Sequence, residues 1–384
     1  MTFKYRLFPT AAQRTKLESV LEICRWVYND TLGIRKDTYE QAGKSLSLYD
    51  TNKLLTEWKV SKPVLKEVHS QVLQNVQERV DLAYQAFFRR VKAGEAPGFP
   101  RFKGKGIYDS FTFKQSGFKL GPEGAPAKLF ISKVGAVLIK LHRPLCAEIK
   151  TLTIQRDAVG NWYACFSCEC AVEPLPALGK VVGVDLGLTT FAYFSDGEKI
   201  ERQRWMQQDA TDIARLQRKK ERFAKGSLER RKVICALHHA YQRATNRRRN
   251  FAHQASRKLI NAYQFIALEK LDIQRMQSNG NKRINRSIAD VAWGQFVQRT
   301  LYKAANAGRV VVQVNPKGTS QICSGCHALV AKDLSVRIHD CPHCGLRIHR
   351  DHNAAINILA RGLAGLSTGS PVVAIEAPAF RHGE

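Results

Sequence analysis

The sequence predicts an α/β fold for the second half of this 384-residue chain. Short apolar runs at 181–184, 189–194, 264–268 and 309–314 read as strands. Amphipathic stretches lie between them, and the order strand, strand, helices, strand, helix, strand is typical of a sheet covered by helices. The first half reads as helices followed by short strands, and the length leaves room for two or three domains of roughly 100–200 residues each.

The charge balance indicates a nucleic-acid partner. The chain has 61 Lys and Arg against 33 Asp and Glu, a net charge of +28. A field of that sign attracts polyanions, of which nucleic acid is the commonest large one. A membrane surface is a rival partner, but the sequence shows no apolar run near about 18 residues and no lipidation signal. Ribosomal-type binding is a second rival, although such proteins rarely need an acid inside a strand.

Cysteine usage indicates a reducing compartment. The first five residues contain no apolar segment of a secretory signal, so we expect a cytoplasmic protein. Ten cysteines in such a compartment favour metal binding over disulfides wherever they occur in pairs.

The first half opens with an alternation of apolar and basic residues over 3–8, which predicts a strand. Thr10 and Gln13 then form a capping-box pattern, and apolar residues at helical spacing carry a helix to about Gly43. A second amphipathic helix, with a shorter one before it, is marked by Leu73, Val76, Val80, Phe87 and Val91. We expect these helices to form a small unit with their apolar stripes in its core.

The stretch 94–117 interleaves aromatic and basic residues on a loop rich in Gly and Pro. Such a loop can stack on bases while it contacts phosphates. A solvated basic loop that packs its own Phe residues fits the pattern equally well, so both interpretations stay open at this point.

Four further runs read as short strands, at 128–131, 136–141, 148–156 and 162–172. We expect a β-barrel-like unit, of which the first strand is a candidate member. The last run contains Cys165, Cys168 and Cys170. Residues three apart in a strand point to opposite faces, so Cys165 and Cys168 cannot share an ion and are expected in the core.

Two strands of the second half carry an acid. Asp185 lies in the otherwise apolar run 181–187, and Glu269 ends the run 264–269. Burying an unpaired ionised carboxylate costs several kcal/mol or more, so such a group is normally paired, protonated or bound to metal. The alternative for Asp185 is a turn residue beside Gly187.

The helical stretch 209–262, with a break at Gly226 and Ser227, is strongly basic. Residues 212–258 hold 15 Lys and Arg against 3 Asp and Glu, a net charge of +12. Exposed helix faces usually carry both signs, so this stretch reads as a surface for phosphates. Farther on, 274–287 is polar and predicts a mobile loop, and 289–308 predicts another helix.

Two C-x-x-C turns separated by 14 residues predict a zinc site. Their thiols belong to Cys323, Cys326, Cys341 and Cys344. Four thiolates on two tight turns close a tetrahedral Zn²⁺ site, which is structural because no coordination position stays open. Four free thiols would instead be exposed reactive groups without a purpose. Three nearby histidines are alternative ligands that we expect on the surface: His327, His339 and His343.

Asp351 lies near the start of an alanine-rich helix over 349–360. A role at the helix start is its simplest interpretation. Together with Asp185 and Glu269 it could complete a site, because three carboxylates repel unless divalent cations lie between them. Oxygen ligands with open positions suit Mg²⁺ or Mn²⁺, and two such ions roughly 3.5–4 Å apart support in-line phosphodiester hydrolysis.

Seven blocks, in order, resemble the TnpB family of transposon-encoded, RNA-guided DNA endonucleases, which is related to type V CRISPR effectors. The blocks are 5–10, 24–29, 98–103, 183–187, 268–271, 319–323 and 350–355. The resemblance covers the chain to about residue 362. Two positions depart from the usual pattern of the family. His349 replaces the first acid of Asp-Arg-Asp, so Asp351 is the expected ligand, and His327 replaces the Gly after the first C-x-x-C.

The resemblance implies an RNase H-like (RuvC) nuclease core with an inserted zinc ribbon, an N-terminal helical recognition lobe and a wedge-type β-barrel. It implies Asp185, Glu269 and Asp351 as catalytic ligands of Mg²⁺ (or Mn²⁺), with two-metal-ion hydrolysis of DNA matched to a guide RNA. The implied partners are that guide RNA and a double-stranded DNA target with a short flanking motif. We expect a protein monomer in the RNA complex, in a prokaryotic cytoplasm and on the nucleoid when bound to DNA.

The boundaries expected from this resemblance are 1–9 for the first barrel strand, 10–95 for the recognition lobe, 96–176 for the barrel, 177–318 for the nuclease core, 319–346 for the zinc ribbon, 347–362 for the last core helix and 363–384 for a disordered tail.

Two other functions stay open. One is a carboxylate-triad transposase, although no separate end-recognition domain is evident. The other is a nuclease-inactive nucleic-acid-binding regulator, against which the three intact acids argue.

Overall fold

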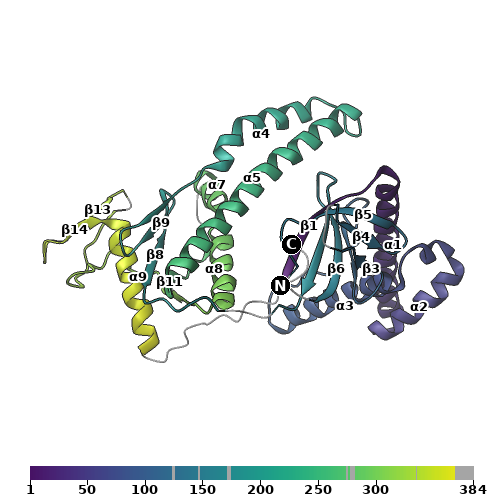
Figure 1. Ribbon diagram of the computed structural model, residues 1–384, viewed down its shortest axis with the longest axis horizontal. Coiled ribbons are helices and arrows are strands. Elements are labelled where there is room, and N and C mark those ends of the chain that lie inside the picture. The colour runs from purple at the N-terminus through teal and green to yellow at the C-terminus, as the bar shows by residue number, and fades with distance from the viewer. Residues whose placement is uncertain are drawn as a thin grey trace. The chain divides into compact units, whose positions relative to one another are not determined.

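The protein is described by a computed structural model that covers residues 1–122, 126–145, 148–170, 174–273, 276, 282–333 and 335–367. The chain forms two compact units, Met1–Ala171 and Val172–Glu384, each of which has its own sheet and helices (Figure 1). The described part of the chain contains no helix with both the length and the apolar character needed to cross a membrane.

The helices of the first unit follow the sequence prediction. They are α1 (Ala11–Ala42), α2 (Leu48–Ser61), the 3-10 helix η1 (Pro63–Glu67) and α3 (Ser70–Lys92). The predicted capping box is present, because Thr10 Oγ1 accepts from the Gln13 N–H at 3.3 Å and Gln13 Oε1 accepts from the Thr10 N–H at 3.0 Å. The helix ends at Gly43, whose φ of 62° is the left-handed conformation that glycine adopts readily.

The sheet of the first unit has seven antiparallel strands in the order β2-β6-β7-β1-β5-β4-β3. Their bounds are β1 (Thr2–Phe8), β2 (Ser110–Phe113), β3 (Phe118–Leu120), β4 (Lys128–Ile131), β5 (Gly135–Lys140), β6 (Ile149–Arg156) and β7 (Trp162–Cys168). The first strand therefore joins the later ones, as expected. Along β7, Cys168 is buried and Cys165 lies on the opposite, half-buried face, so these two thiols do not share a site.

The sheet of the second unit has the order β10-β9-β8-β11-β12. Its strands are β8 (Val181–Leu186), β9 (Thr190–Phe194), β10 (Lys199–Glu201), β11 (Phe265–Glu269) and β12 (Val310–Val314). Strands β8, β11 and β12 run parallel, whereas β9 and β10 are antiparallel to their neighbours. The predicted α/β alternation of this half is confirmed.

Five described helices accompany this sheet, namely α4 (Trp205–Glu221), α5 (Leu228–Ala262), α7 (Lys282–Val291), α8 (Trp293–Ala307) and α9 (Arg350–Ser367). One face of the sheet packs its apolar side chains against α5 and α8, and α9 contacts β8, β9, β11 and β12. The break between α4 and α5 falls where the sequence pattern placed it, and Ser227 Oγ caps α5 by accepting from the Arg230 N–H at 3.2 Å.

The sequence pattern gave a wrong prediction for the segment before α8. Residues 282–287, predicted as part of a loop, belong to α7, whose buried Ile288 and Val291 supply a helical apolar face that the polar composition obscures. The helix expected over 289–308 is divided at Ala292, which has a φ of 54°. The remaining residues of the predicted loop, 274–275 and 277–281, lie outside the described residues.

The last helix lies directly against the sheet because two glycines leave room for it. A Cβ on Gly183 of β8 would lie 2.6 Å from the Leu359 backbone nitrogen of α9, and closer still to the Ala355 carbonyl oxygen. A Cβ on Gly362 of α9 would lie 2.7 Å from the Ala267 Cβ of β11. Helix α9 continues to Ser367, beyond the end expected at 362, and residues 368–384 lie outside the described part of the chain.

Candidate active site and zinc centre

Asp185 and Glu269 lie on adjacent parallel strands at the same level. Leu268 of β11 pairs with Val184 of β8, which places Glu269 level with Asp185. Side chains alternate along a strand, so Asp185 shares the face of Gly183 and Glu269 shares the face of Ala267. This is the face that α9 covers. Asp185 is therefore a strand residue of the inner sheet, and the alternative of a turn residue is wrong.

Electrostatic interactions join Asp185 to Glu269 and to Asp351, which lies in the first turn of α9. Burial raises the pKa of the Asp185 carboxyl well above its ordinary value, and the charges of Glu269 and Asp351 raise it further, against the opposing effect of Arg350. Burial also raises the pKa of Glu269, although a hydrogen bond from Thr319 and the charge of Arg361 act in the opposite direction. The fold thus places Glu269 and Asp351 close enough to Asp185 for their charges to act on it.

The raised pKa of Asp185 leads to a stability prediction for the metal-free protein. A carboxyl whose pKa is higher in the folded than in the unfolded chain binds its proton more tightly when folded, so stability falls as pH rises above the ordinary value of 3.8. Each tenfold difference in proton affinity between the folded and the unfolded chain corresponds to about 1.4 kcal/mol, or a few degrees of melting temperature.

Asp185→Asn is therefore expected to raise the melting temperature at pH 7.5 in EDTA by several degrees, and by less at pH 5. The matched control is Asp212→Asn, which changes a carboxylate that is 60% exposed. Thermal melts at both pH values test the prediction, and an unchanged or lowered melting temperature for the Asp185 variant would contradict it.

His349, the position that departs from the family pattern, caps α9. Its Nδ1 accepts a hydrogen bond from the Asp351 N–H at 3.2 Å. Its ring stacks on Tyr193, with 5.1 Å between the ring centroids and 9° between the planes. Because the imidazole makes the capping bond, the carboxylate of Asp351 is not used for it. Asp351 is therefore not the capping residue, but it does lie in the first turn of α9, as the simpler interpretation also allowed.

Thr319, a residue that no sequence pattern assigned to the site, holds Glu269. Its hydroxyl donates to Glu269 Oε1 at 2.6 Å, and both residues are buried. A hydrogen bond to an ionised acceptor is among the stronger ones that a protein makes. Thr319 therefore fixes the position of one carboxylate oxygen of Glu269.

A polar stripe along α9 fixes the segment 315–324 that carries Thr319. Asn357 Nδ2 donates to the carbonyl oxygens of Thr319 and Ile322 at 2.9 and 2.7 Å. Asn353 Nδ2 donates to the Ile322 oxygen at 2.8 Å, and Asn353 Oδ1 accepts from the Ser324 N–H at 2.9 Å. The same stripe includes Arg350 and Arg361, which donate to Ser320, Asn315 and Lys317. The helix that bears Asp351 thus also positions Thr319 against Glu269.

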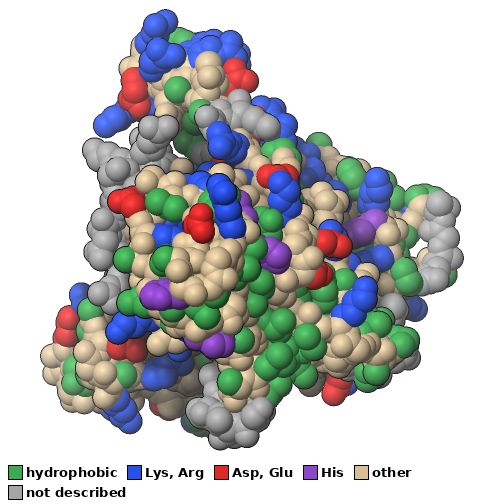
Figure 2. Space-filling model, turned by 90° about the vertical axis from the view of Figure 1, so that its left-hand side faces the viewer, with side chains coloured by type: hydrophobic (Ala, Val, Ile, Leu, Met, Phe, Trp, Pro, Cys, Tyr) green, Lys and Arg blue, Asp and Glu red, His purple; other side chains and the backbone are tan. Residues whose placement is uncertain are grey.

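The hairpin of α4 and α5 presents the basic surface that the sequence predicts. Figure 2 shows Lys and Arg side chains gathered at the upper end of the molecule, where Figure 1 places this hairpin. Within 212–258, five of the 15 cations lie within 4.0 Å of a carboxylate, namely Arg215, Lys220, Arg230, Arg247 and Lys258. The other ten have no such ion pair among the described residues, which leaves them available for an anionic partner.

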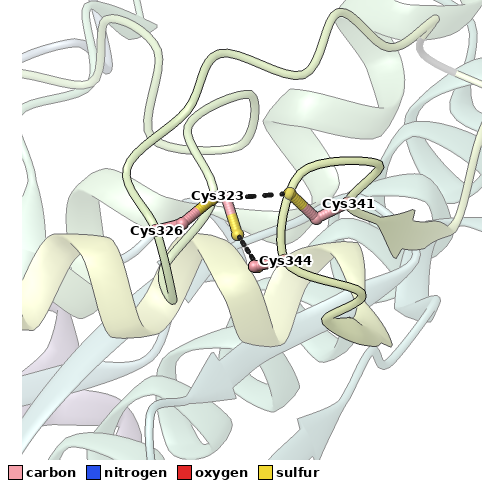
Figure 3. A group of neighbouring side chains, drawn as sticks. All are labelled: Cys323, Cys326, Cys341 and Cys344. Atoms are coloured by element: carbon pink, nitrogen blue, oxygen red, sulfur yellow. Dashed lines mark hydrogen bonds between the residues drawn. The ribbon is translucent and has the colours of Figure 1, made fainter.

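The four cysteine sulfurs lie together as the zinc prediction requires (Figure 3). All four lie within 4.8 Å of one another, and the Cys323–Cys344 and Cys326–Cys341 sulfur distances are both 3.6 Å. Zn–S bonds of about 2.3 Å in a tetrahedron bring sulfurs to such separations. The three carboxylates are not among the groups of described residues that could hold a metal ion in this way. The cluster could hold one structural zinc ion.

The two cysteine turns have the same backbone form. The His327 N–H donates to the Cys323 carbonyl oxygen, and the Gly345 N–H donates to that of Cys341, both at 2.9 Å. His327 has a φ of 62° and Gly345 a φ of 73°. His327 therefore adopts the left-handed conformation that glycine adopts in the second turn, at a cost of about 1–2 kcal/mol.

One of the three histidines near the zinc cluster is not on the surface. His327 and His343 are exposed, as expected, but His339 is fully buried. Strand β13 (Ile338–Asp340) pairs with β14 (Arg347–His349), and this short ladder turns the His339 side chain inward, where Lys332 contacts it. The expectation for His339 is wrong because the pairing that buries it is not encoded in a local pattern.

Replacing one zinc ligand tests the metal assignment. Cys341→Ser is expected to reduce bound zinc from about one ion per chain to about a tenth or less, and to lower the thermal stability of the second unit, because structural zinc contributes directly to folding. Metal analysis of the purified protein and a thermal melt measure the two effects. The matched control is Cys235→Ser, which removes an exposed thiol of α5. Unchanged zinc content in the Cys341 variant would refute the assignment.

Three family models match this chain. They are described as a helix-turn-helix domain (residues 1–44), a probable transposase (163–280) and a Cas12f1-like TNB domain (293–358). A Streptomyces pristinaespiralis protein, named as a candidate RNA-guided DNA endonuclease, is 33% identical over 378 residues, which cover 96% of this chain and 91% of that protein. InsQ of Escherichia coli (strain K12), with the same designation, is 30% identical over 387 residues, which cover 96% and 94%.

Two solved structures share the fold at low sequence identity. One is a Cas12f1–sgRNA–target DNA complex, with a TM-score of 0.57, 13% identity and coverage of 89% of this chain and 81% of that one. The other is the mini RNA-guided endonuclease Cas_phi3, with a TM-score of 0.53, 10% identity and coverage of 94% and 92%.

Proposed function

Because this chain belongs to the TnpB family of RNA-guided DNA endonucleases, we propose that it cuts guide-matched DNA by two-metal-ion hydrolysis at Asp185, Glu269 and Asp351. One observation carries this assignment. The three acids come from β8, β11 and α9, and yet the charges of Glu269 and Asp351 act on the pKa of Asp185. Acids that converge from three separate elements, at the cost of mutual repulsion, are typical of a functional site.

The strand order β10-β9-β8-β11-β12 supports an RNase H-like (RuvC) core for the second unit. The cysteine cluster lies between β12 and α9, which supports a zinc ribbon inserted into that core. In the first unit, α1 to α3 are the proposed recognition lobe, and the seven-stranded sheet is the proposed wedge barrel. These assignments follow the family and agree with the order of the elements along the chain.

The donor set fits hard divalent cations, Mg²⁺ or Mn²⁺, because all of its atoms are carboxylate oxygens. Such ions, when bound, supply a polarised water and charge stabilisation for the leaving oxygen. Asp185 and Glu269 would hold them from two rigid strands, and Asp351 from the capped start of α9. Thr319 keeps Glu269 in one orientation, and the unpaired cations of α4 and α5 would hold the nucleic-acid backbone.

Thr319 is expected to affect cleavage through Glu269. Thr319→Val keeps the shape of the side chain but removes the donor, and a lost hydrogen bond to a charged group lowers the cleavage rate by about 10- to 100-fold. Thr319→Ser keeps the hydroxyl and should restore most of the rate. Single-turnover cleavage across a Mg²⁺ titration, with RNA binding measured in parallel, tests this. Equal rates for the Val and Ser variants would show that the hydroxyl has no positioning role.

Purification from the native host tests the function as a whole. We expect the protein to retain a discrete RNA, and sequencing of that RNA identifies the guide. The complex should then cut a duplex that matches the guide beside the correct flanking motif, in Mg²⁺ and not in EDTA. A nucleic-acid-free preparation indifferent to added guide would favour the regulator, and joined rather than cut DNA would favour the transposase.

Light scattering of the RNA complex tests the proposed monomer.

A further inference from the structure

A cluster of aromatic rings lies at the C-terminal end of α3. Phe87 contacts Phe88 and Phe99, with ring centroids 5.2 and 5.5 Å apart, and Tyr84 contacts the same two rings at 6.3 and 5.7 Å. Despite these contacts, Phe88 stays 52% exposed and Phe99 46% exposed. Phe99, in the loop between α3 and β2, therefore packs against rings of α3 and leaves part of its own ring uncovered.

Phe102, farther along this loop, is also uncovered. Its ring is 57% exposed and lies beside Gly33 of α1. Two residues farther along α1, the guanidinium of Arg35 covers the ring of Tyr84 at 4.5 Å. We call the exposed rings of Phe88, Phe99 and Phe102 the aromatic platform. All three belong to one unit of the protein.

The exposure of Phe102 is built into the fold, because the loop backbone beside it is fixed to α1. Asn29 pairs with Lys103 in both directions, accepting from the Lys103 N–H at 2.8 Å and donating to its carbonyl oxygen at 3.0 Å. Arg25 donates to the same oxygen at 3.2 Å. A single exposed ring is common on a protein surface, but three such rings in one segment of the chain indicate an interaction surface.

The charge around the platform selects the partner. Residues 84–105 contain six cations and one acid: Arg89, Arg90, Lys92, Arg101, Lys103 and Lys105, against Glu95. None of the six forms an ion pair among the described residues. Arg90 lies beside Gly98, next to Phe99. A second copy of this chain would bring like charges together, whereas flat rings among unpaired cations suit nucleotides whose bases are free to stack.

We propose that the aromatic platform stacks on unpaired bases of the bound guide RNA, while the neighbouring arginines hold its phosphates. This inference rests on the RNA binding of the proposed function and adds a site outside the nuclease unit. It predicts two separable contributions to affinity. Stacking on Phe102 is insensitive to salt, whereas the phosphate contact of Arg101 depends on it.

Fluorescence anisotropy with the full chain and a labelled, unstructured 15-nucleotide RNA tests the site. Phe102→Ala is expected to weaken binding about tenfold and to leave the dependence of log affinity on log salt unchanged. Phe102→Tyr should bind as the wild type does, and Phe102→Leu should bind as weakly as the alanine variant. Arg101→Ala should instead reduce the salt slope by about one. The matched control is Tyr39→Ala, which removes a ring of α1 that is 63% exposed.

Several results would overturn the platform. The platform is contradicted if Phe102→Ala or Phe102→Leu binds the RNA with wild-type affinity. It is also contradicted if Phe102→Ala weakens binding only to a single-stranded DNA of the same sequence, or if the wild-type protein is a dimer that this change dissociates. If the wild-type protein binds no RNA, the proposed function fails with the platform. If all variants bind RNA and cut equally well, only the platform fails.

Discussion

Replacing Asp185 by asparagine, or Glu269 by glutamine, is expected to lower the DNA cleavage rate by about 10³-fold or more while RNA binding is retained. Both changes preserve shape and remove one negative charge from a site that would hold divalent cations only through its carboxylates. A loss of that size corresponds to about 4 kcal/mol of transition-state stabilisation. RNA binding should persist because the basic hairpin and the first unit are unaltered.

Single-turnover cleavage of a guide-matched duplex measures the first effect, and anisotropy with the guide RNA measures the second. Asp212→Asn, which changes an exposed carboxylate of α4, should cut at the wild-type rate. If either active-site variant also cuts at that rate, the three acids are not the catalytic set. If RNA binding is lost together with cleavage, the variant has damaged more than the metal site.

Replacing Gly183 by alanine is expected to destabilise the second unit by about 3 kcal/mol, which lowers its melting temperature by roughly 6–12 °C. The new methyl group would overlap backbone atoms of α9, at Ala355 and Leu359, and backbone cannot move aside as a flexible side chain can. The helix must shift away from β8, and Asp351 moves with it. We therefore expect cleavage to fall by at least about 100-fold, since misplacing a catalytic group by about 1 Å costs that much.

Helix α9 supplies a matched pair of controls for this effect. Gly362→Ala should also destabilise, because its Cβ would lie 2.7 Å from that of Ala267. In Gly365→Ala, three residues along the same helix, the added methyl group lies within 4 Å of no neighbouring atom of the described residues. This variant should be neutral or stabilising by up to about 1 kcal/mol, given the helix propensity of alanine. Thermal melts and cleavage rates for all three variants test the close packing. Wild-type stability in the Gly183 variant would show that α9 need not touch β8.

Much of the fold was predictable from the sequence because the relevant signals are local. The capping box at Thr10, the break at Gly226 and Ser227, and the paired cysteines each depend on residues within a few positions of one another. The acids Asp185 and Glu269 stood out for the same reason, since a carboxylate inside an apolar strand is visible without the rest of the chain. The grouping of Asp351 with them was a hypothesis from the mutual repulsion of three carboxylates, which the family resemblance then also implied.

Other features depend on contacts between distant segments, and only the tertiary structure decided them. Thr319 reaches Glu269 across 50 positions of the chain, and Asn357 holds Thr319 across 38. His339 is buried by a strand pairing with β14, and the loop beside the exposed Phe102 is held by Asn29 of α1. The sequence by itself thus determined the candidate acids and cysteines of this protein, but not residues such as Thr319 that support them. The packing of α9 against the sheet determined which of them meet, because hydrogen-bond geometry and close approach are set by the relative positions of whole elements.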